Sequence, residues 1–331
     1  MKKFRNWAIG ASISLAALII AFWGLQPERL IDVFGRSRPG FLVPAALAVV
    51  LGLFARARSW HVLLGKKTEY RRAFWALNEG YLMNSVLPLR LGEVGRAYSV
   101  SRRAPVSGGM ALATVVVERL IDVAVSLAAL VVSLGFIAAP RWAGNVAMAG
   151  GAVLGAGILG AALLILTRKQ LLELLARLPG ARWIGLAGLF DAFAGGFGEV
   201  ADAGRLSRSG LWSLAAWVTA WIQLAFVFLM FDLQGSLVTF VFVTGVTAFG
   251  AALPSSPGAL GVFELSMLAA MTVVGYEQVD GVSVAVTAHV LQVGITGALG
   301  AVALAREGES VVSLAKRAQN MMNQVQEEAT A

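Results

Sequence analysis

The chain has 331 residues, of which 58% are apolar and 14% charged, and its mean hydropathy is +0.74. Soluble domains carry roughly 45–50% apolar and about 25% charged residues, so the composition excludes an ordinary soluble domain and predicts an all-α, polytopic membrane protein. The formal charge of +8 suits an anionic lipid leaflet, and long apolar runs argue against a nucleic-acid partner.

Several kinds of chemistry are excluded by residue type. The absence of cysteine rules out disulfides, thiolate metal sites and cysteine nucleophiles, and there are only two histidines, so we expect no metal site and no cofactor. No G-x-x-x-x-G-K-[ST] motif occurs, which argues against ATP-driven transport by this chain alone. The G-x-G-x-x-G pattern at 155–160 lies inside an apolar run and instead predicts a small-residue packing face.

Six segments are apolar enough to cross a membrane, which takes about 20 mostly apolar residues. They are residues 7–25, 41–64, 112–139, 144–166, 211–231 and 281–304. The first follows a basic stretch like that of a signal peptide, but no small-x-small cleavage site follows it, so we predict an uncleaved span. Two other apolar stretches are broken, 74–87 by Pro88 and 237–275 by Pro-Ser-Ser-Pro-Gly at 254–258. Residues 168–177 predict a separate amphipathic helix on the inner leaflet.

The distribution of Lys and Arg predicts the orientation. Of these residues, 22 fall in segments on the side of the N-terminus, four fall on the opposite side and Arg119 lies within a span, so both termini should be cytoplasmic. Residues 74–89 then return to the inner face and 237–275 to the outer face, as two re-entrant hairpins of opposite direction. This arrangement is typical of an inverted-repeat transporter, whose breaks mark the binding site. Eight full spans are the alternative, and we find no residue-level repeat.

We interpret residues 1–305 as a single transmembrane domain of about six full spans plus the two broken or re-entrant hairpins. Residues 306–331 are predicted to form a polar cytoplasmic tail.

The first cluster of candidate site residues lies at the end of the first broken stretch. Asn84 precedes Pro88, and Arg90, Glu93 and Arg96 follow it. On a helix Glu93 lies three residues from each arginine, so one carboxylate could hold two guanidiniums in place to bind a phosphate. The alternative is that this segment is only a cytoplasmic basic loop.

The second cluster, Glu118, Arg119 and Asp122, lies within a predicted span. Ionisable groups inside a span are costly, so they usually pair or line a polar cavity. Glu118 and Asp122 share a helix face, whereas Arg119 should point about 100° away. The two acids need a cation between them, which Arg90, Arg96 or a coupling ion could supply. The alternative is a buried pair of Arg119 and Asp122 that only joins helices.

The third cluster lies at the second break, where Pro257 is expected to begin a new helix. Ser255, Ser256 and the free amides of residues 258–260, including Gly258, would form an anion cradle. Glu264 would then lie about two turns inside that helix, where it needs a cation or a proton. A plain interhelical turn is the alternative.

His289 is a further candidate in the last span. It lies three residues from Gln292, so the two side chains could share a cavity face or could hydrogen-bond a neighbouring helix. We favour the second interpretation.

In this order, the three clusters resemble those of a known family. The patterns are Asn-x-x-x-Pro-x-Arg-x-Gly-Glu-x-x-Arg, then Glu-Arg-x-x-Asp opening a span, then Pro-x-x-Pro-Gly-x-x-Gly-x-x-Glu. They are similar to the transmembrane region of lysylphosphatidylglycerol synthase and its stand-alone, flippase-like relatives, over residues 5–305. The resemblance implies lipid translocation, which in the full-length synthases moves aminoacylated phosphatidylglycerol between leaflets. Other stand-alone members are associated with hopanoid or isoprenoid-linked glycolipid pathways.

We therefore predict an inner-membrane flippase, and not an enzyme, for an anionic or phosphate-linked lipid such as aminoacylated phosphatidylglycerol or an isoprenoid-linked glycolipid. The expected phosphate ligands, in a site between the two hairpins, are Arg90, Arg96, Arg119, Ser255, Ser256 and Gly258. The expected polar lining or coupling groups are Asn84, Glu93, Glu118, Asp122, Glu264 and His289. The alternatives are a membrane-embedded lipid-modifying transferase with Glu93 or Asp122 as general base, or a non-catalytic partner of a lipid synthase. A separate lipid synthase or glycosyltransferase is the expected protein partner.

Overall fold

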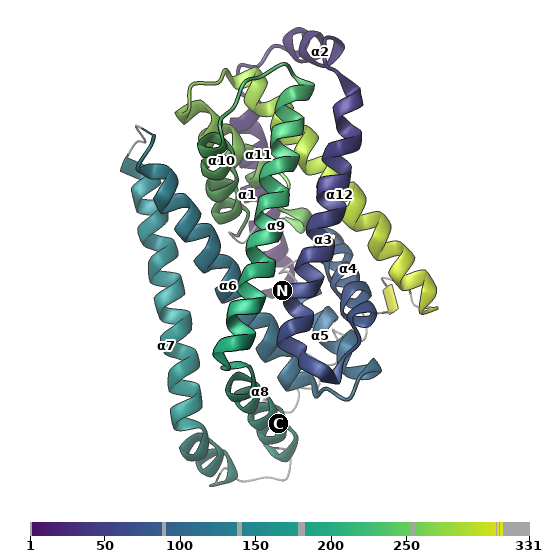
Figure 1. The fold of residues 1–331 in the computed structure, drawn as a ribbon, viewed down its shortest axis with the longest axis vertical. Coiled ribbons are helices and arrows are strands. Elements are labelled where there is room, and N and C mark those ends of the chain that lie inside the picture. The colour runs from purple at the N-terminus through teal and green to yellow at the C-terminus, as the bar shows by residue number, and fades with distance from the viewer. Residues whose placement is uncertain are drawn as a thin grey trace. The chain divides into compact units, whose positions relative to one another are not determined.

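The computed structural model describes residues 2–87, 91–137, 141–177, 183–252 and 256–308, together with 310, 312 and 313. Over these residues the chain is almost entirely helical and has no strand (Figure 1). The α-helices are α1 (Lys2–Phe22), α2 (Pro27–Gly35), α3 (Leu42–Leu64), α4 (Tyr70–Val86), α5 (Gly92–Arg103), α6 (Gly108–Leu134), α7 (Arg141–Arg177), α8 (Trp183–Val200), α9 (Ala203–Met230), α10 (Leu237–Ala252), α11 (Val262–Val273) and α12 (Gln278–Arg306). The 3-10 turns are η1 (Pro39–Phe41), η2 (Gly65–Lys67) and η4 (Pro257–Ala259).

The chain forms two compact units, each built from three segments. The first unit comprises Met1–Phe54, Ala124–Ala152 and Leu214–Thr296, and the second comprises Ala55–Val123, Val153–Ser213 and Gly297–Ala331. Large apolar side chains form the core of the first unit, among them Phe228, Phe242 and Met271. A separate cluster around Leu63, Phe197 and Val200 is buried in the second.

Among the described residues, four helical segments are long and apolar enough to cross a membrane, and they match four of the six predicted spans. They are Pro39–Lys67, Arg141–Leu164, Ala203–Met230 and Gln278–Arg306. A fifth is added if Ser12–Phe22 and α2, which are bent by 76° at their junction, form one span. Helix α6 has 27 residues and covers most of the remaining predicted span, but it carries three ionisable residues. The fold is that of a helical membrane protein, and the number of spans stays a prediction.

Helix α7 differs from the prediction. We expected residues 168–177 to form a separate helix on the membrane surface, but they continue α7, which has 37 residues. The prediction was wrong because nothing between residues 161 and 177 ends a helix: this stretch contains neither Gly nor Pro. Large apolar side chains along α7 are exposed, as expected of a helix whose neighbours are lipid chains.

The first broken stretch folds as an antiparallel helical hairpin, α4 and α5, within the second unit. The two helices touch closely, because a Cβ on Gly92 would lie 1.9 Å from the carbonyl oxygen of Gly80. At the same end, Asn84 Oδ1 accepts the Gly92 amide at 2.8 Å. At the far end, Arg103 Nη1 donates to Glu79 Oε1 at 2.9 Å. The chain therefore turns back near the predicted break, but the returning helix is α5, outside the predicted bounds of 74–89, and re-entry into the membrane stays a prediction.

The second broken stretch folds as a hairpin of α10 and α11 within the first unit. A Cβ on Gly250 would lie 1.8 Å from Ser266 Oγ, so these helices also approach closely. The break between them turns sharply at Gly258 and Gly261, whose φ angles of 70° and 82° favour glycine. Helix α11 begins directly after this turn, at Val262.

The two hairpins occupy equivalent places in a repeated order of elements. Helices α3, α4, α5 and α6 have 23, 17, 12 and 27 residues, and α9, α10, α11 and α12 have 28, 16, 12 and 29. Helix α3 begins in the first unit and ends in the second, which holds the first hairpin, whereas α9 begins in the second unit and ends in the first, which holds the second hairpin. This reversal is the order that an inverted repeat predicts.

Candidate functional site

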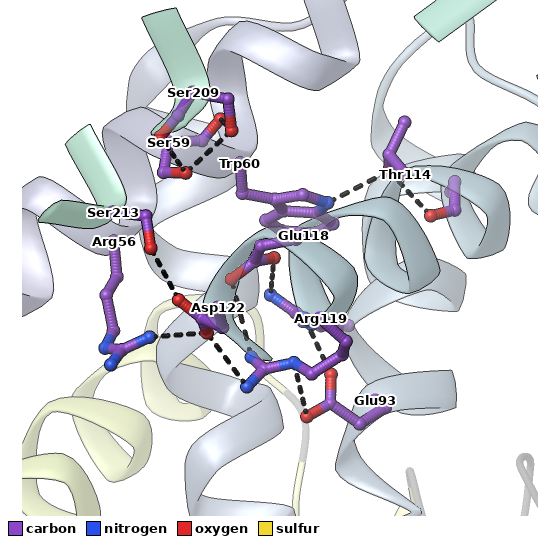
Figure 2. Close-up of polar contacts among 12 residues, drawn as sticks. Arg56, Ser59, Trp60, Glu93, Thr114, Glu118, Arg119, Asp122, Ser209 and Ser213 are labelled. Carbon is purple, nitrogen blue, oxygen red and sulfur yellow. Dashed lines mark hydrogen bonds and ion pairs between the residues drawn. The ribbon is translucent and has the colours of Figure 1, made fainter. Parts of the chain in front are cut away.

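A network of buried ionic side chains lies in the second unit, on α3, α5 and α6 (Figure 2). We call it the arginine network, and its members are Arg56, Glu93, Arg96, Glu118, Arg119 and Asp122. Three guanidiniums therefore face three carboxylates. Burying charge is costly unless it is paired and hydrogen-bonded, so the quality of each contact decides what each arginine can do.

Arg96 is held tightly on three sides. Its Nη2 lies 2.6 Å from Glu93 Oε2 and its Nη1 lies 2.7 Å from Glu118 Oε2. Its guanidinium also lies over the ring of Trp60, 4.7 Å from the centroid, and the Trp60 indole is fixed by a 3.0 Å hydrogen bond to Thr114. Only 2% of the Arg96 side chain is exposed, so this arginine would have to break its contacts within the protein before it could bind a ligand.

Asp122 anchors Arg56 in the same way. Arg56 Nη1 lies 2.7 Å from Asp122 Oδ2, and Ser213 Oγ donates to Asp122 Oδ1 at 2.6 Å. Both carboxylate oxygens are thus used, which satisfies a group that is 11% exposed.

Arg119 is held more loosely. Its guanidinium lies between the three acids (Figure 2), 3.3 Å from Asp122, 3.4 Å from Glu118 and 3.5 Å from Glu93. Charge-assisted N–H···O bonds are usually about 2.7–2.9 Å long, so each of these contacts is weak. Its side chain is 34% exposed, the largest exposure in the network. Arg119 is therefore the arginine of this network best able to exchange its partners for an incoming anion.

Three predictions about this cluster can be compared with the geometry. Glu93 holds Arg96 at i, i+3 as expected. Arg96, one of the cations expected from another segment, reaches Glu118. Arg119 itself reaches both Glu118 and Asp122, so the buried Arg119–Asp122 contact given as the alternative is present too. The expected angle of about 100° describes the direction in which Arg119 leaves the helix. Its side chain is long enough for the guanidinium to reach back to the two acids.

The other two residues of the first motif have different outcomes. Asn84 closes the α4–α5 hairpin through its bond to the Gly92 amide, and a role in lining a path stays a prediction. Arg90 lies outside the described residues, so its phosphate role also stays a prediction.

A second buried pair lies in the first unit, and we call it the histidine pair: Glu264 of α11 and His289 of α12. His289 Nδ1 lies 2.6 Å from Glu264 Oε1, and His289 Nε2 lies 2.9 Å from the carbonyl oxygen of Gly258. The imidazole also stacks on Phe263 with 4.3 Å between centroids. As predicted, His289 hydrogen-bonds a neighbouring helix.

The bonds of the histidine pair imply one shared proton. A carbonyl oxygen can only accept, so His289 Nε2 must donate to Gly258. The short Nδ1 contact then needs a second proton, either on His289 beside ionised Glu264 or on Glu264 beside neutral His289. In either form the pair is neutral overall, which suits two side chains that are 6% and 7% exposed.

The position of Glu264 corrects the sequence prediction. We expected it two turns inside a helix that begins at Pro257, but α11 begins at Val262, so Glu264 lies in the first turn. There its Oε2 accepts the amide of Gly261 at 2.7 Å. An acid is favoured at this end of a helix, which explains why it is tolerated.

The anion cradle expected at this break has fewer free donors than we predicted. The amide of Ser256 donates to Ser14 Oγ at 3.0 Å, and the amide of Ala259 donates to the Ser256 carbonyl at 3.0 Å. Gly258 presents its carbonyl to His289. Ser255 lies outside the described residues, and anion binding by this segment stays a prediction.

Sequence analysis missed three members of the site: Arg56, Trp60 and Ser213. Arg56 was counted as a topological charge, although it lies inside a predicted span, where the rule applied to Glu118 would also have selected it. Trp60 and Ser213 carried no signal, because their role depends on contacts between segments far apart in the sequence.

Over the part of the chain that is described, no group of three or more His, Asp or Glu side chains is placed to hold a metal ion.

Comparisons with known proteins agree on the family. The family model described as "Lysylphosphatidylglycerol synthase TM region" matches residues 7–300. Glycosyltransferase AglD of Haloferax volcanii is 26% identical over 302 residues, 79% of this chain and 48% of AglD. The UPF0104 membrane protein MJ1595 of Methanocaldococcus jannaschii is 29% identical over 114 residues, 33% of each chain. The chain thus spans about half or less of these relatives, and no solved structure matches.

Proposed function

Because the chain belongs to the lysylphosphatidylglycerol synthase TM-region family, we propose that it moves an anionic, phosphate-linked lipid between the leaflets of the cytoplasmic membrane. The resemblance to full-length synthases, which implies translocation of aminoacylated phosphatidylglycerol, supports this proposal. The observation that carries it is the state of Arg119, a partly exposed guanidinium with three long contacts to carboxylates.

In this proposal Arg119 binds the lipid phosphate and then releases it. A phosphate oxygen pair can take two short, parallel bonds from one guanidinium, and these bonds are stronger than the contacts of 3.3–3.5 Å that Arg119 makes. The three acids compete for the same guanidinium and so keep phosphate binding reversible. Reversibility is required of a transporter, because a substrate bound too tightly is not released.

The other arginines hold the site in place. Arg96 and Arg56 keep Glu118 and Asp122 paired through contacts of 2.7 Å when Arg119 turns to the substrate. Glu93 is 21% exposed, and we assign it to the polar lining of the route that the lipid headgroup takes past Arg119. We assign the phosphate to Arg119 before Arg96, because Arg96 would have to break two short bonds first.

We also propose that both termini face the cytoplasm. The four Lys and Arg residues expected outside belong to the first unit, and the inner ones belong to the second, apart from those at the N-terminus. The cysteine-free sequence allows a direct test, because a single introduced cysteine has no background. Asp202→Cys should be protected from a membrane-impermeant thiol reagent in intact cells, and Gln234→Cys should be labelled. The reverse pattern would reject the orientation.

We propose that a separate lipid synthase or glycosyltransferase supplies the substrate, and that this chain itself does no covalent chemistry. The relative AglD is named a glycosyltransferase, which supports a link to glycosyl transfer. A lipid-modifying transferase is the competing proposal. Product formation by the purified chain, incubated with lipid and a sugar donor, would favour that alternative.

Transport can be tested in vesicles that contain the purified chain. Fluorescent phosphatidylglycerol carries a headgroup phosphate, whereas fluorescent glucosylceramide has a polar headgroup without one. We expect the protein to accelerate leaflet exchange of the first lipid and not of the second, measured by access of a quencher to the outer leaflet. Equal acceleration of both lipids, or of neither, would reject a phosphate-dependent flippase.

A further inference from the structure

The second unit contains a cavity of about 410 Å³ that is separate from the arginine network. The end of α3, the turn η2 and the first turns of α9 line it. Its ionisable lining residues are Arg58, His61, Lys66, Lys67, Arg205 and Arg208, and none of the lining residues that the structure describes is acidic. Like charges gathered around one hollow repel each other, so an anion inside it would be attracted by all of them.

Neighbouring acids neutralise little of this charge. Lys67 Nζ lies 2.8 Å from Glu199 Oε2, and no other lining cation has a carboxylate partner among the described residues. Arg205 donates to the carbonyl of Glu199, and Arg208 donates to the carbonyl of Gly204. Carbonyl contacts orient these guanidiniums but leave their charge unpaired.

The remaining cations have weaker attachments. Arg58 Nη1 lies 3.4 Å from His61 Nδ1, and the Arg58 guanidinium lies 5.6 Å from the centre of the Tyr70 ring. Lys66 makes no hydrogen bond or ion pair with the part of the chain that is described. Both side chains can therefore turn towards a ligand without losing a salt bridge.

The cavity is built on a fixed turn. Gly65 has a φ of 71°, and a Cβ placed on it would lie 3.5 Å from Arg205 Nη1, so the guanidinium rests against this glycine. The amide of Thr68 donates to Gly65, and the carbonyl of Thr68 lies 2.8 Å from His61 Nε2. The turn is thus tied back to α3. The positive-inside rule requires these cations to face the cytoplasm, but it does not require them to converge on one hollow.

We propose that this cavity binds a phosphate group carrying two or more negative charges, as a phosphomonoester or a diphosphate. Arginine pairs with phosphate through two parallel bonds, and lysine adds a mobile charge. The volume falls within the roughly 300–1,000 Å³ of small-molecule pockets. Val62 and Leu64, also in the lining, offer apolar contacts to the group that bears the phosphate. The phosphate can belong to a lipid headgroup or to a soluble molecule.

Binding of inorganic pyrophosphate to the full-length protein in a non-ionic detergent tests the site by calorimetry. R205Q/R208Q removes two charge-assisted contacts and should weaken binding roughly tenfold or more. R71Q/K169Q removes two exposed cations that do not line the cavity, and it should bind like the wild type. R205K/R208K keeps the charge and should keep part of the affinity, which separates loss of the site from loss of the fold.

A second arm distinguishes the two sources of phosphate. Nanodiscs of phosphatidylcholine with a minor share of phosphatidic acid provide the lipid phosphomonoester, and native mass spectrometry counts the acidic lipids retained. Retention that falls in R205Q/R208Q, and that pyrophosphate displaces, assigns the site to a headgroup. Pyrophosphate binding that depends on these arginines without such retention assigns it to a soluble phosphate. The proposal is overturned if R205Q/R208Q binds both probes like the wild type, or if R71Q/K169Q loses as much affinity.

Discussion

The arginine network and the histidine pair both place a basic side chain beside an acidic one and an aromatic ring, and both join the second helix of a hairpin to the long helix that follows. In the network Arg96 of α5 meets Glu118 of α6 and lies on Trp60. In the pair the acid and the base are exchanged between the helices, because Glu264 is on α11 and His289, which lies on Phe263, is on α12. An acid–base contact between the second helix of the hairpin and the long helix after it therefore occurs in both parts of the repeated order of elements.

The two sites differ in what can change. Arg119 is the loosely held arginine of the network, and its guanidinium keeps its proton, so it exchanges partners by moving its side chain. The histidine pair has no loosely held side chain, but it depends on a single shared proton. Under the proposed function the network would bind substrate, whereas the histidine pair joins α11 to α12.

The largest expected effect on stability is in the arginine network. Glu118→Ala leaves Arg96 buried with Glu93 alone and should lower the free energy of unfolding by about 3–5 kcal/mol. Glu199→Ala breaks an exposed pair with Lys67 and should cost about 0–1 kcal/mol. Unfolding by SDS in mixed micelles measures both. Equal losses of unfolding free energy in the two variants would show that the buried ion pairs of the network are no more stabilising than the exposed pair.

The next effect concerns the hairpin that carries the network. Gly92→Ala places a methyl group against the Gly80 carbonyl and should cost about 1–3 kcal/mol, with partial loss of the Arg96 contacts. Gly155→Ala is the matched control, because its Cβ meets nothing within 4 Å. Normal stability of Gly92→Ala would mean that α4 and α5 do not approach so closely.

The histidine pair should be less sensitive than the network. Glu264→Ala removes an acceptor from His289 and should cost about 1–3 kcal/mol. A double-mutant cycle with His289→Ala isolates the coupling of the two side chains. A cost for Glu264→Ala above that of Glu118→Ala would reverse the comparison between the two sites.

The smallest effect should come from the closure of the first hairpin. Asn84→Ala removes one hydrogen bond to the Gly92 amide, and we expect a loss of about 0.5–1.5 kcal/mol, measured by the same unfolding assay. Ser85→Ala removes only a contact within α4 and should stay within about 0.5 kcal/mol of wild type. A larger loss for Ser85→Ala would contradict the role given to Asn84.

The sequence located the breaks of both hairpins because Pro88 and the 254–258 bend interrupt otherwise apolar stretches, which is a local signal, but it did not predict α5 as the returning arm of the first hairpin. It also selected five of the six network residues, Glu118, Arg119 and Asp122 because ionisable groups inside spans are rare, and Glu93 and Arg96 because of their helical spacing. It could not show which cation meets which acid. That depends on the packing of α3 against α6, and on the long side chain of Arg119, which no spacing rule fixes.

The start of α11 was missed for a related reason. Pro257 is a common first residue of a helix, but the left-handed conformation at Gly258 ends the turn and delays the helix to Val262. That delay brings Glu264 to the helix end and within reach of His289. The pairing of these two residues was therefore not readable from the sequence.

The most direct test of the central claim is the rate at which fluorescent phosphatidylglycerol crosses vesicles that contain Arg119 variants. Loss of a charge-assisted bond to phosphate should slow Arg119→Ala roughly tenfold or more, while Arg119→Lys should keep part of the rate. Arg38→Ala, which breaks an exposed pair with Asp232, is the control and should move lipid like the wild type. A wild-type rate for Arg119→Ala would contradict the assignment of the lipid phosphate to Arg119.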